Sequence, residues 1–148
     1  MNGMAAVAMG VLVVAGASMA VQAPVNAALG RSLGASVPAA AISFGTGCLI
    51  LTAIAVALGQ GGGFLVMGRA APWQFLGGAL GALYVWGALW SVGTLGAVTM
   101  IAAVILGQML GAMALDTWGA LGLPARELSL TRVLSVVLVA AGLLLSRL

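Results

Sequence analysis

The sequence predicts an all-α integral membrane protein with five transmembrane helices, and three observations support this fold class. Only five basic and two acidic side chains are present, so 5% of the residues are charged, against about a quarter in a soluble domain. The residues are 64% hydrophobic, and the mean hydropathy is +1.27. The charged residues are separated by uncharged tracts long enough to cross a bilayer, which takes about 20 residues per helix. Such a chain needs lipid as its solvent.

The composition also excludes several functional classes. The net charge of +3 comes from scattered arginines that form no basic patch, so we expect no nucleic-acid binding. The chain has no histidine, and Cys48 is its single cysteine. We therefore expect no metal site, no cofactor and no intrachain disulfide. Enzymes that work in lipid usually need several acids, histidines or a nucleophile with its base. Since this chain has few such residues, we expect that the protein is not an enzyme.

The first two helices are delimited by arginine and glycine. We expect the first helix over about 4–29, ended by Arg31 and Gly34. It lacks the positively charged n-region of a signal peptide, and its apolar run continues past any cleavage point. We therefore interpret it as a retained helix. The second helix is expected over about 36–58, before a loop that contains the glycines 61–63.

The remaining helices are separated by turn-forming and polar residues. The next uncharged tract has the length of two helices, which we expect over about 72–91 and 95–115. Small and turn-forming residues over 91–96 mark the break between them. The polar segment 116–129 then precedes a last, aliphatic helix over about 130–147.

Together the helices form a single transmembrane domain over 1–148, with its termini on opposite sides of the membrane. The positive-inside rule gives almost no orientation, because the two sides receive nearly equal numbers of arginines. The side of the N-terminus receives Arg69, Arg126 and Arg132, and the other side receives Arg31 and Arg147. This balance predicts a chain that inserts in both orientations and pairs with a second copy as an antiparallel homodimer of ten helices. The alternative is a single orientation set by weak cues or by a partner subunit.

The first helix carries the best candidates for a binding site. Ser18, Gln22 and Asn26 are four residues apart and share one stripe of that helix. Pro24 lies inside the stripe, and its ring displaces the carbonyl of Ala20, so we expect a helix kink. Amides in hydrocarbon need hydrogen-bond partners, so the stripe should face protein or water. We predict that Gln22 and Asn26 contact substrate; the alternative is that they join neighbouring helices.

Three further polar side chains are candidates for substrate contact. Tyr84 follows the small-residue face of the third helix, so its hydroxyl should point into the bundle. Ser43 can line a cavity, although a hydroxyl can also bond back to its own helix. Gln108 in the fourth helix either joins two helices or contacts substrate. Trp86 and Trp90 lie opposite the glycine face, which indicates lipid contact in preference to a cation-binding cage.

Glycines at a spacing of four residues predict where helices pack closely. Gly77 and Gly81 form such a pair in the third helix, and Gly107 and Gly111 form another in the fourth. Small residues let two helix backbones approach each other in a membrane. The stripe in the fourth helix is therefore expected at a helix–helix or subunit interface.

Asp116 is the one carboxylate next to a predicted span. A membrane carboxylate often couples transport to protons, but a structural role is the alternative, and we favour that role here. Negative charge is unfavourable at the C-terminal end of a helix, so a compensating cation is expected, with Arg126 as the candidate. Ser129 is the candidate N-cap of the last helix.

Three segments resemble a known family. They are QAPVNAALGRSLGASVPAAAISFGTG, PWQFLGGALGALYV and GQMLGAMALDTWGALGLP. Their order is similar to that of the YdcZ-type family of bacterial inner-membrane proteins, within the drug/metabolite transporter superfamily. The resemblance implies a half-transporter of five helices and antiparallel assembly. Small multidrug resistance proteins of the same superfamily use a glutamate in the first helix, which this chain lacks. An amide-and-hydroxyl site suits a neutral or weakly polar solute better than a cation.

We therefore expect a small-molecule secondary transporter, acting as an exporter, in the bacterial inner (cytoplasmic) membrane. It would work by alternating access as a dual-topology antiparallel homodimer, with the site between the kinked first helices and the Tyr84 faces. Its expected partners are the lipid bilayer, the small-molecule substrate and a second copy of the chain. The alternative is a non-transporting membrane subunit that docks a larger complex through its glycine stripes.

Overall fold

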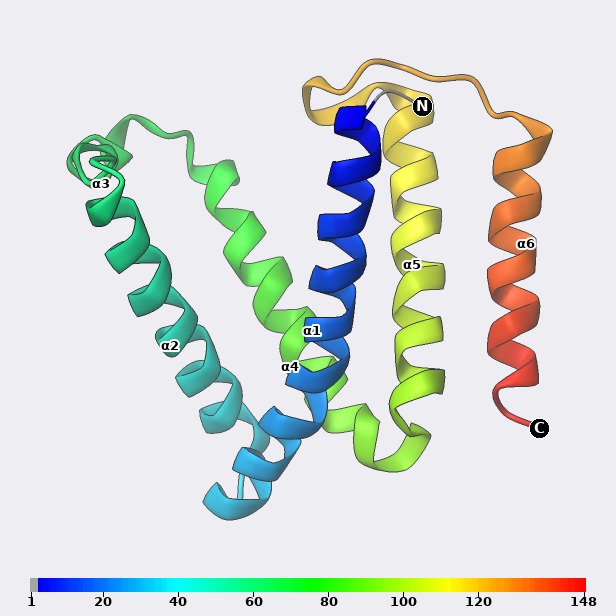
Figure 1. The fold of residues 1–148 in the computed structure, drawn as a ribbon, viewed down its shortest axis with the longest axis horizontal. Helices are drawn as coiled ribbons and strands as arrows, with labels where there is room; N and C mark the ends of the chain where they lie inside the picture. Colours follow the sequence, from blue (N-terminus) through cyan, green and yellow to red (C-terminus); the bar gives the residue numbers. More distant parts are fainter. Residues whose placement is uncertain (1–2) are drawn as a thin grey trace. The chain divides into compact units, whose positions relative to one another are not determined.

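The computed structural model in Figure 1 describes residues 3–148. Met1 and Asn2, with which the expected domain begins, lie outside the described residues. Every regular element over residues 3–148 is helical, which confirms the expected all-α class. The elements are α1 (Gly3–Leu33), α2 (Ser36–Ala57), α3 (Gly62–Leu65), η1 (Met67–Arg69), η2 (Pro72–Phe75), α4 (Leu76–Leu95), α5 (Ala97–Trp118), η3 (Ala120–Gly122) and α6 (Leu130–Leu145).

Four helical stretches among the described residues are long and apolar enough to cross a membrane. They are Gly3–Leu33, Ser36–Ala57, Pro72–Leu95 and Ala97–Trp118. The fifth apolar helix, α6, has 16 residues and ends at Leu145 instead of at about 147. At about 1.5 Å per residue it is about 24 Å long, somewhat less than the thickness of the hydrocarbon core.

The first helix is longer than the sequence predicts, and a glycine turn ends it. α1 runs to Leu33 instead of to about 29. Gly34 follows with φ of +70°, a backbone conformation that glycine adopts without strain. This turn lets the N–H of Ala35 donate to the carbonyl of Gly30 at 3.0 Å, which satisfies a carbonyl at the end of the helix.

The predicted break over 91–96 is wrong in extent, because a single residue forms it. α4 continues as a helix to Leu95, and Gly96 alone turns the chain, with φ of +76°. Turn-forming residues stay helical when the helix around them is apolar and long, so composition overstated the loop. α5 likewise runs to Trp118 instead of about 115, and it ends on Gly119 with φ of +60°.

The chain divides into two compact units, Met1–Gly93 and Thr94–Leu148. In the first unit α1 packs on α2, and α4 meets both helices through side-chain contacts beside two glycines. A Cβ added at Gly30 of α1 would lie 3.6 Å from Cδ2 of Leu89 in α4. A Cβ added at Gly81 of α4 would lie 3.5 Å from the ring of Phe44 in α2. An added Cβ at either position would be in ordinary van der Waals contact with the neighbouring side chain, so the helices pack closely at both points.

The second unit is an antiparallel pair of helices, α5 and α6, joined by η3 and a loop. A polar contact lies at each end of the pair. At one end, Arg132 Nη2 donates to Asp116 Oδ2 at 2.8 Å. At the other, the hydroxyl of Thr99 donates to the carbonyl of Ser146 at 3.1 Å. The two contacts fix the register of α5 against α6.

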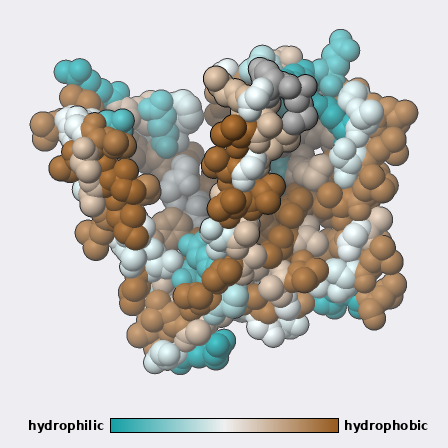
Figure 2. Space-filling model, in the orientation of Figure 1, coloured by the Kyte–Doolittle hydropathy of each residue, from teal (hydrophilic) through white to brown (hydrophobic). Residues whose placement is uncertain are grey.

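Most apolar side chains are exposed, as expected for a chain surrounded by lipid. Hydrophobic residues cover much of the face shown in Figure 2. In α1, no residue of the 18-residue stretch with the highest hydropathy is buried. The buried apolar residues are few and mostly small: Ala23, Ala27, Ala39, Ala40, Val85, Ala88, Leu89, Val92 and Met100. Apolar surface of this extent has to be covered by lipid or by another chain.

Candidate functional site

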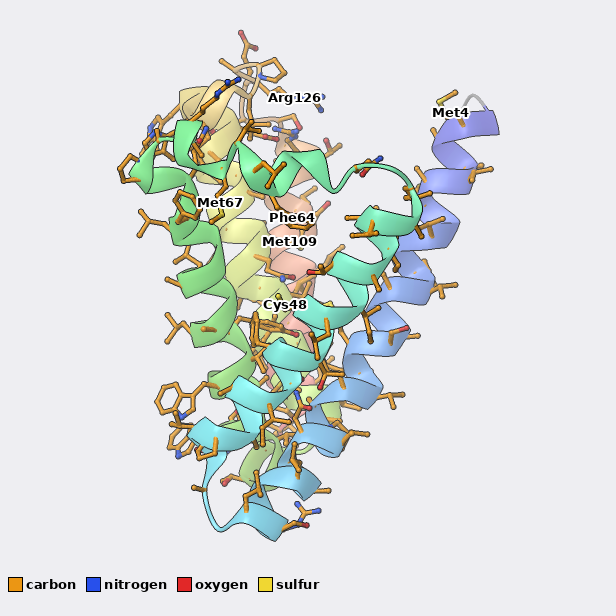
Figure 3. All side chains as sticks on the ribbon, turned by 90° about the vertical axis from the view of Figure 1, so that its left-hand side faces the viewer. Met4, Cys48, Phe64, Met67, Met109 and Arg126 are labelled. Carbon is orange, nitrogen blue, oxygen red and sulfur yellow. The ribbon has the colours of Figure 1, made fainter. Side chains whose placement is uncertain are left out.

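A cavity of about 620 Å³ lies in the first unit between α1, α2 and α3. It is lined by Gln22, Ser43, Phe44, Gly47, Cys48, Leu51, Thr52, Ala55 and Phe64. Figure 2 shows a hollow between the arm formed by α2 and α3 and the neighbouring α1. Figure 3 labels two of the lining residues, Cys48 on α2 and Phe64 on α3. This volume lies within the range of pockets that hold drug-sized ligands.

The polar groups of this cavity lack hydrogen-bond partners within residues 3–148. Gln22, Ser43 and Thr52 supply an amide and two hydroxyls to a wall that is otherwise apolar, apart from the thiol of Cys48. Hydroxyls elsewhere in the helices bond back to their own carbonyls: Thr46, for example, donates to Ile42 at 3.0 Å. The two cavity hydroxyls do not, so their hydrogen-bonding capacity is available to a bound molecule.

A second, much smaller cavity lies between α1 and α4. Its volume is about 10 Å³, and Gln22, Asn26 and Tyr84 are among its lining residues. Asn26 is only 5% exposed, and its amide makes no hydrogen bond to the described residues. The space is about that of one water molecule, which such an amide could hold. Gln22 lines both cavities and stands between them.

The structure therefore brings most of the sequence-predicted site residues together. Gln22, Asn26 and Tyr84 meet at the small cavity, and Gln22 and Ser43 meet at the large one. Gln108 is exposed on α5, in the second unit. Pro24 lies within α1, whose ribbon changes direction in its second half (Figure 1). Contact of these side chains with a substrate stays a prediction.

Sequence reasoning missed part of the large cavity. Thr52 lies nine residues after Ser43, which is about half a turn around the helix, so the two share no helical stripe. Phe64 lies in α3, within a segment that its glycines indicated to be a loop. The cavity covers about half of the circumference of α2, and a search for one polar stripe could not have found it.

Asp116 has a different partner from the one the sequence indicated. The predicted pairing of its carboxylate with Arg126 is wrong, because the ion pair is with Arg132 at 2.8 Å. Arg126 reaches Asp116 through the backbone, where its N–H donates to the carbonyl of Asp116 at 2.8 Å. The pair borders a cavity of about 230 Å³ that also contains Ser135. Arg132 Nη1 is itself fully buried and has no hydrogen-bond partner among residues 3–148.

Ser129 is confirmed as the N-cap of α6, because its hydroxyl accepts a hydrogen bond from the N–H of Arg132 at 3.4 Å.

The rings of Trp86 and Trp90 stack on each other, with centroids 6.4 Å apart and planes 22° apart. Both side chains are exposed, at 40% and 71%, as lipid contact requires.

The predicted packing glycines have different surroundings. Gly81 faces Phe44, whereas a Cβ added at Gly77, Gly107 or Gly111 would meet no described atom within 4 Å. The stripe in α5 is thus open within residues 3–148.

Comparison with known proteins identifies one family. A model of the family described as "Putative inner membrane exporter, YdcZ" matches residues 7–145, which is nearly the whole chain. No curated protein and no solved structure matches the chain.

Proposed function

The chain belongs to the family described as "Putative inner membrane exporter, YdcZ", and we propose on this basis that it is a secondary transporter that exports a small molecule. The family match over residues 7–145 is the observation that carries the proposal. The apolar helices agree with it, since they are those of a multi-pass protein of the inner membrane. The description of the family names an exporter and no enzymatic activity.

The proposed working form is an antiparallel homodimer of ten helices. Its support is the near balance of arginines, which gives the chain almost no preferred orientation. The exposed apolar surface of α1 agrees with a second copy as a cover. In this form α6 is the fifth crossing, and its shortness is accommodated by local thinning of the bilayer.

The proposed substrate site is centred on Gln22, which borders both cavities of the first unit. Ser43 contributes from the large cavity, and Asn26 and Tyr84 contribute when the small cavity widens during the transport cycle. Gln108 is a further proposed contact. In an antiparallel pair, alternating access follows when the two identical chains exchange conformations, so that each state is the mirror of the other.

The first experiment tests transport and site together. The purified chain is reconstituted in proteoliposomes loaded with a mixed panel of neutral small molecules, and efflux is followed by mass spectrometry. We expect Gln22→Ala and Asn26→Ala to lose efflux while chemical crosslinking still detects the dimer. Normal efflux by both variants would refute the site.

A second experiment tests the orientation. In a Cys48→Ser chain, a single cysteine is added after Leu148 and exposed to a membrane-impermeant thiol reagent, before and after cell lysis. Labelling of about half the population in intact cells is expected for dual topology. Complete labelling or complete protection would contradict it. A wild-type chain that neither dimerises nor releases any of the panel would favour the docking-subunit function, which the open stripe of Gly107 and Gly111 would then serve.

A further inference from the structure

We propose that the cavity between α1, α2 and α3 binds uncharged, mainly apolar molecules that carry hydroxyl or carbonyl groups. The inference rests on the proposed export function and names the substrate class of its site. It narrows the sequence-based expectation of a neutral or weakly polar solute to molecules with a large apolar body, because the wall of the cavity is mainly apolar. It also places the body of the substrate beside α2 and α3, away from the small cavity that Asn26 and Tyr84 line.

The apolar character comes from the side chains that make up most of the wall. Phe44, Leu51 and Ala55 line the cavity from α2, and Phe64 lines it from α3. Two aromatic rings and an aliphatic chain favour a ligand with a broad apolar body. At about 620 Å³, the space is far larger than a few waters or a single ion would need.

The polar part of the ligand follows from three unpartnered groups. Gln22, Ser43 and Thr52 make no hydrogen bond to the described residues, although each lines the cavity. An amide and two hydroxyls can donate to and accept from hydroxyl and carbonyl groups. A ligand without such groups would leave them unsatisfied, which is costly in a low-dielectric site.

The absence of charge from the wall excludes ions as good ligands. None of the seven charged side chains of the chain, five basic and two acidic, is among the lining residues. A cation or anion brought into this cavity would lose its hydration without gaining a counter-charge. An uncharged molecule avoids that penalty.

The same groups argue against a lipid acyl chain or a helix of a second copy as the occupant of the cavity. A lipid acyl chain has no hydrogen-bonding group for Gln22, Ser43 or Thr52. A helix of a second copy presents backbone groups that are already bonded within the helix. A small molecule with its own hydroxyl or carbonyl groups satisfies both the apolar wall and the three polar side chains.

The test uses two probes of similar size that differ in charge. Triphenylphosphine oxide is neutral and has an apolar body, and its phosphoryl oxygen accepts hydrogen bonds as a carbonyl oxygen does. Tetraphenylphosphonium is a cation without such an acceptor. Each radiolabelled probe is equilibrated by dialysis with the intact chain in nanodiscs, and partition into empty nanodiscs is subtracted. We expect saturable binding of the neutral probe and at least tenfold weaker binding of the cation. Equal or tighter binding of the cation would overturn the proposal.

Variants then locate the bound probe, each with a matched control on the same helix. Thr52→Val removes a cavity hydroxyl and keeps the shape, while Thr46→Val removes a hydroxyl that is bonded to its own helix. Cys48→Trp fills the cavity, while Leu49→Trp adds a similar ring at the same depth on a residue that is 74% exposed and outside the cavity lining. We expect Thr52→Val to weaken binding about threefold to tenfold. We expect Cys48→Trp to abolish it and both controls to leave it unchanged.

The outcomes separate this inference from the proposed function. Two results would overturn the substrate class and leave export standing. One is equal binding by all four variants, and the other is no saturable binding by a chain that still exports the panel. Saturable, variant-sensitive binding without efflux of any compound would support the cavity and count against the transporter. The hydroxyl variants keep the test independent of folding, because each changes one atom group without changing side-chain volume.

Discussion

Neutralising Asp116 should loosen the start of α6, because its ion pair with Arg132 offsets two unfavourable charges. Asp116 lies in the last turn of α5, where a negative charge opposes the helix dipole. Arg132 lies in the first turn of α6, where a positive charge does the same. Each charge is unfavourable in its own helix, and the bond of 2.8 Å between them compensates both.

The expected size of the effect follows from the burial of the pair. Two unit charges at about 4 Å attract by about 4 kcal/mol at an effective dielectric constant of 20. The side chains are 31% and 29% exposed, so solvent screening removes a large part of this attraction. Hydrogen bonds to charged groups contribute about 1.5–3 kcal/mol, and relief of the dipole conflict at Asp116 returns about 0.5 kcal/mol. Because the pair is partly exposed, its hydrogen bond falls in the lower part of that range, and we expect Asp116→Asn to reduce the local stability by about 1–2 kcal/mol.

Hydrogen–deuterium exchange of the intact chain in nanodiscs measures this change. A loss of 1–2 kcal/mol should speed exchange of the amides in the first turns of α6 by about 5–30-fold. Glu127→Gln is the matched control, since Glu127 makes no ion pair in the part of the chain that the structure describes. The double variant Asp116→Asn/Arg132→Gln should lose less than the sum of the two single variants. Equal exchange in Asp116→Asn and Glu127→Gln, or strict additivity, would refute the reasoning.

Three further predictions concern stability. Gly119→Ala should lower the unfolding midpoint in detergent, followed by circular dichroism, by several degrees: φ is +60°, and the new Cβ would lie 3.1 Å from that of Ala125. An unchanged midpoint would contradict this. Gly81→Leu should lower the midpoint more than Gly77→Leu, because the ring of Phe44 lies beside Gly81, whereas a Cβ added at Gly77 would meet no described atom within 4 Å. Equal effects would count against close packing at Gly81. Thr99→Val should weaken the other end of the α5–α6 pair by about 1 kcal/mol, seen as faster exchange in the last turn of α6 and not in its first.

Much of the fold could be predicted from where the charges and glycines lie. The positions of Arg31 and Gly34 located the first turn, and Ser129 marked the start of α6. The ends of α1 and α5 were placed too early, because glycine turns and not polar composition end these helices. Composition is a weak guide there, since lipid allows small polar residues to stay helical.

The candidate site could be predicted in part, for a physical reason that particular residues illustrate. Helical spacing identified Gln22 and Asn26, because it reports which residues share a face of one helix. It cannot report which faces of different helices enclose a space, so Thr52 and Phe64 were missed. The pairing of Asp116 with Arg132 was missed likewise, since it depends on how α6 returns along α5.

The contacts at the two ends of the α5–α6 pair have a mechanical consequence. Thr99 and Asp116 are seventeen residues apart on α5, so the bonds to Ser146 and Arg132 are separated by about 25 Å along the helix axis. Sliding α6 by one helical turn would break both bonds at once, because each depends on the same register. The two bonds therefore resist sliding of α6 along α5. Changes of shape within this chain are more easily made where helices meet across small side chains and open cavities than between α5 and α6.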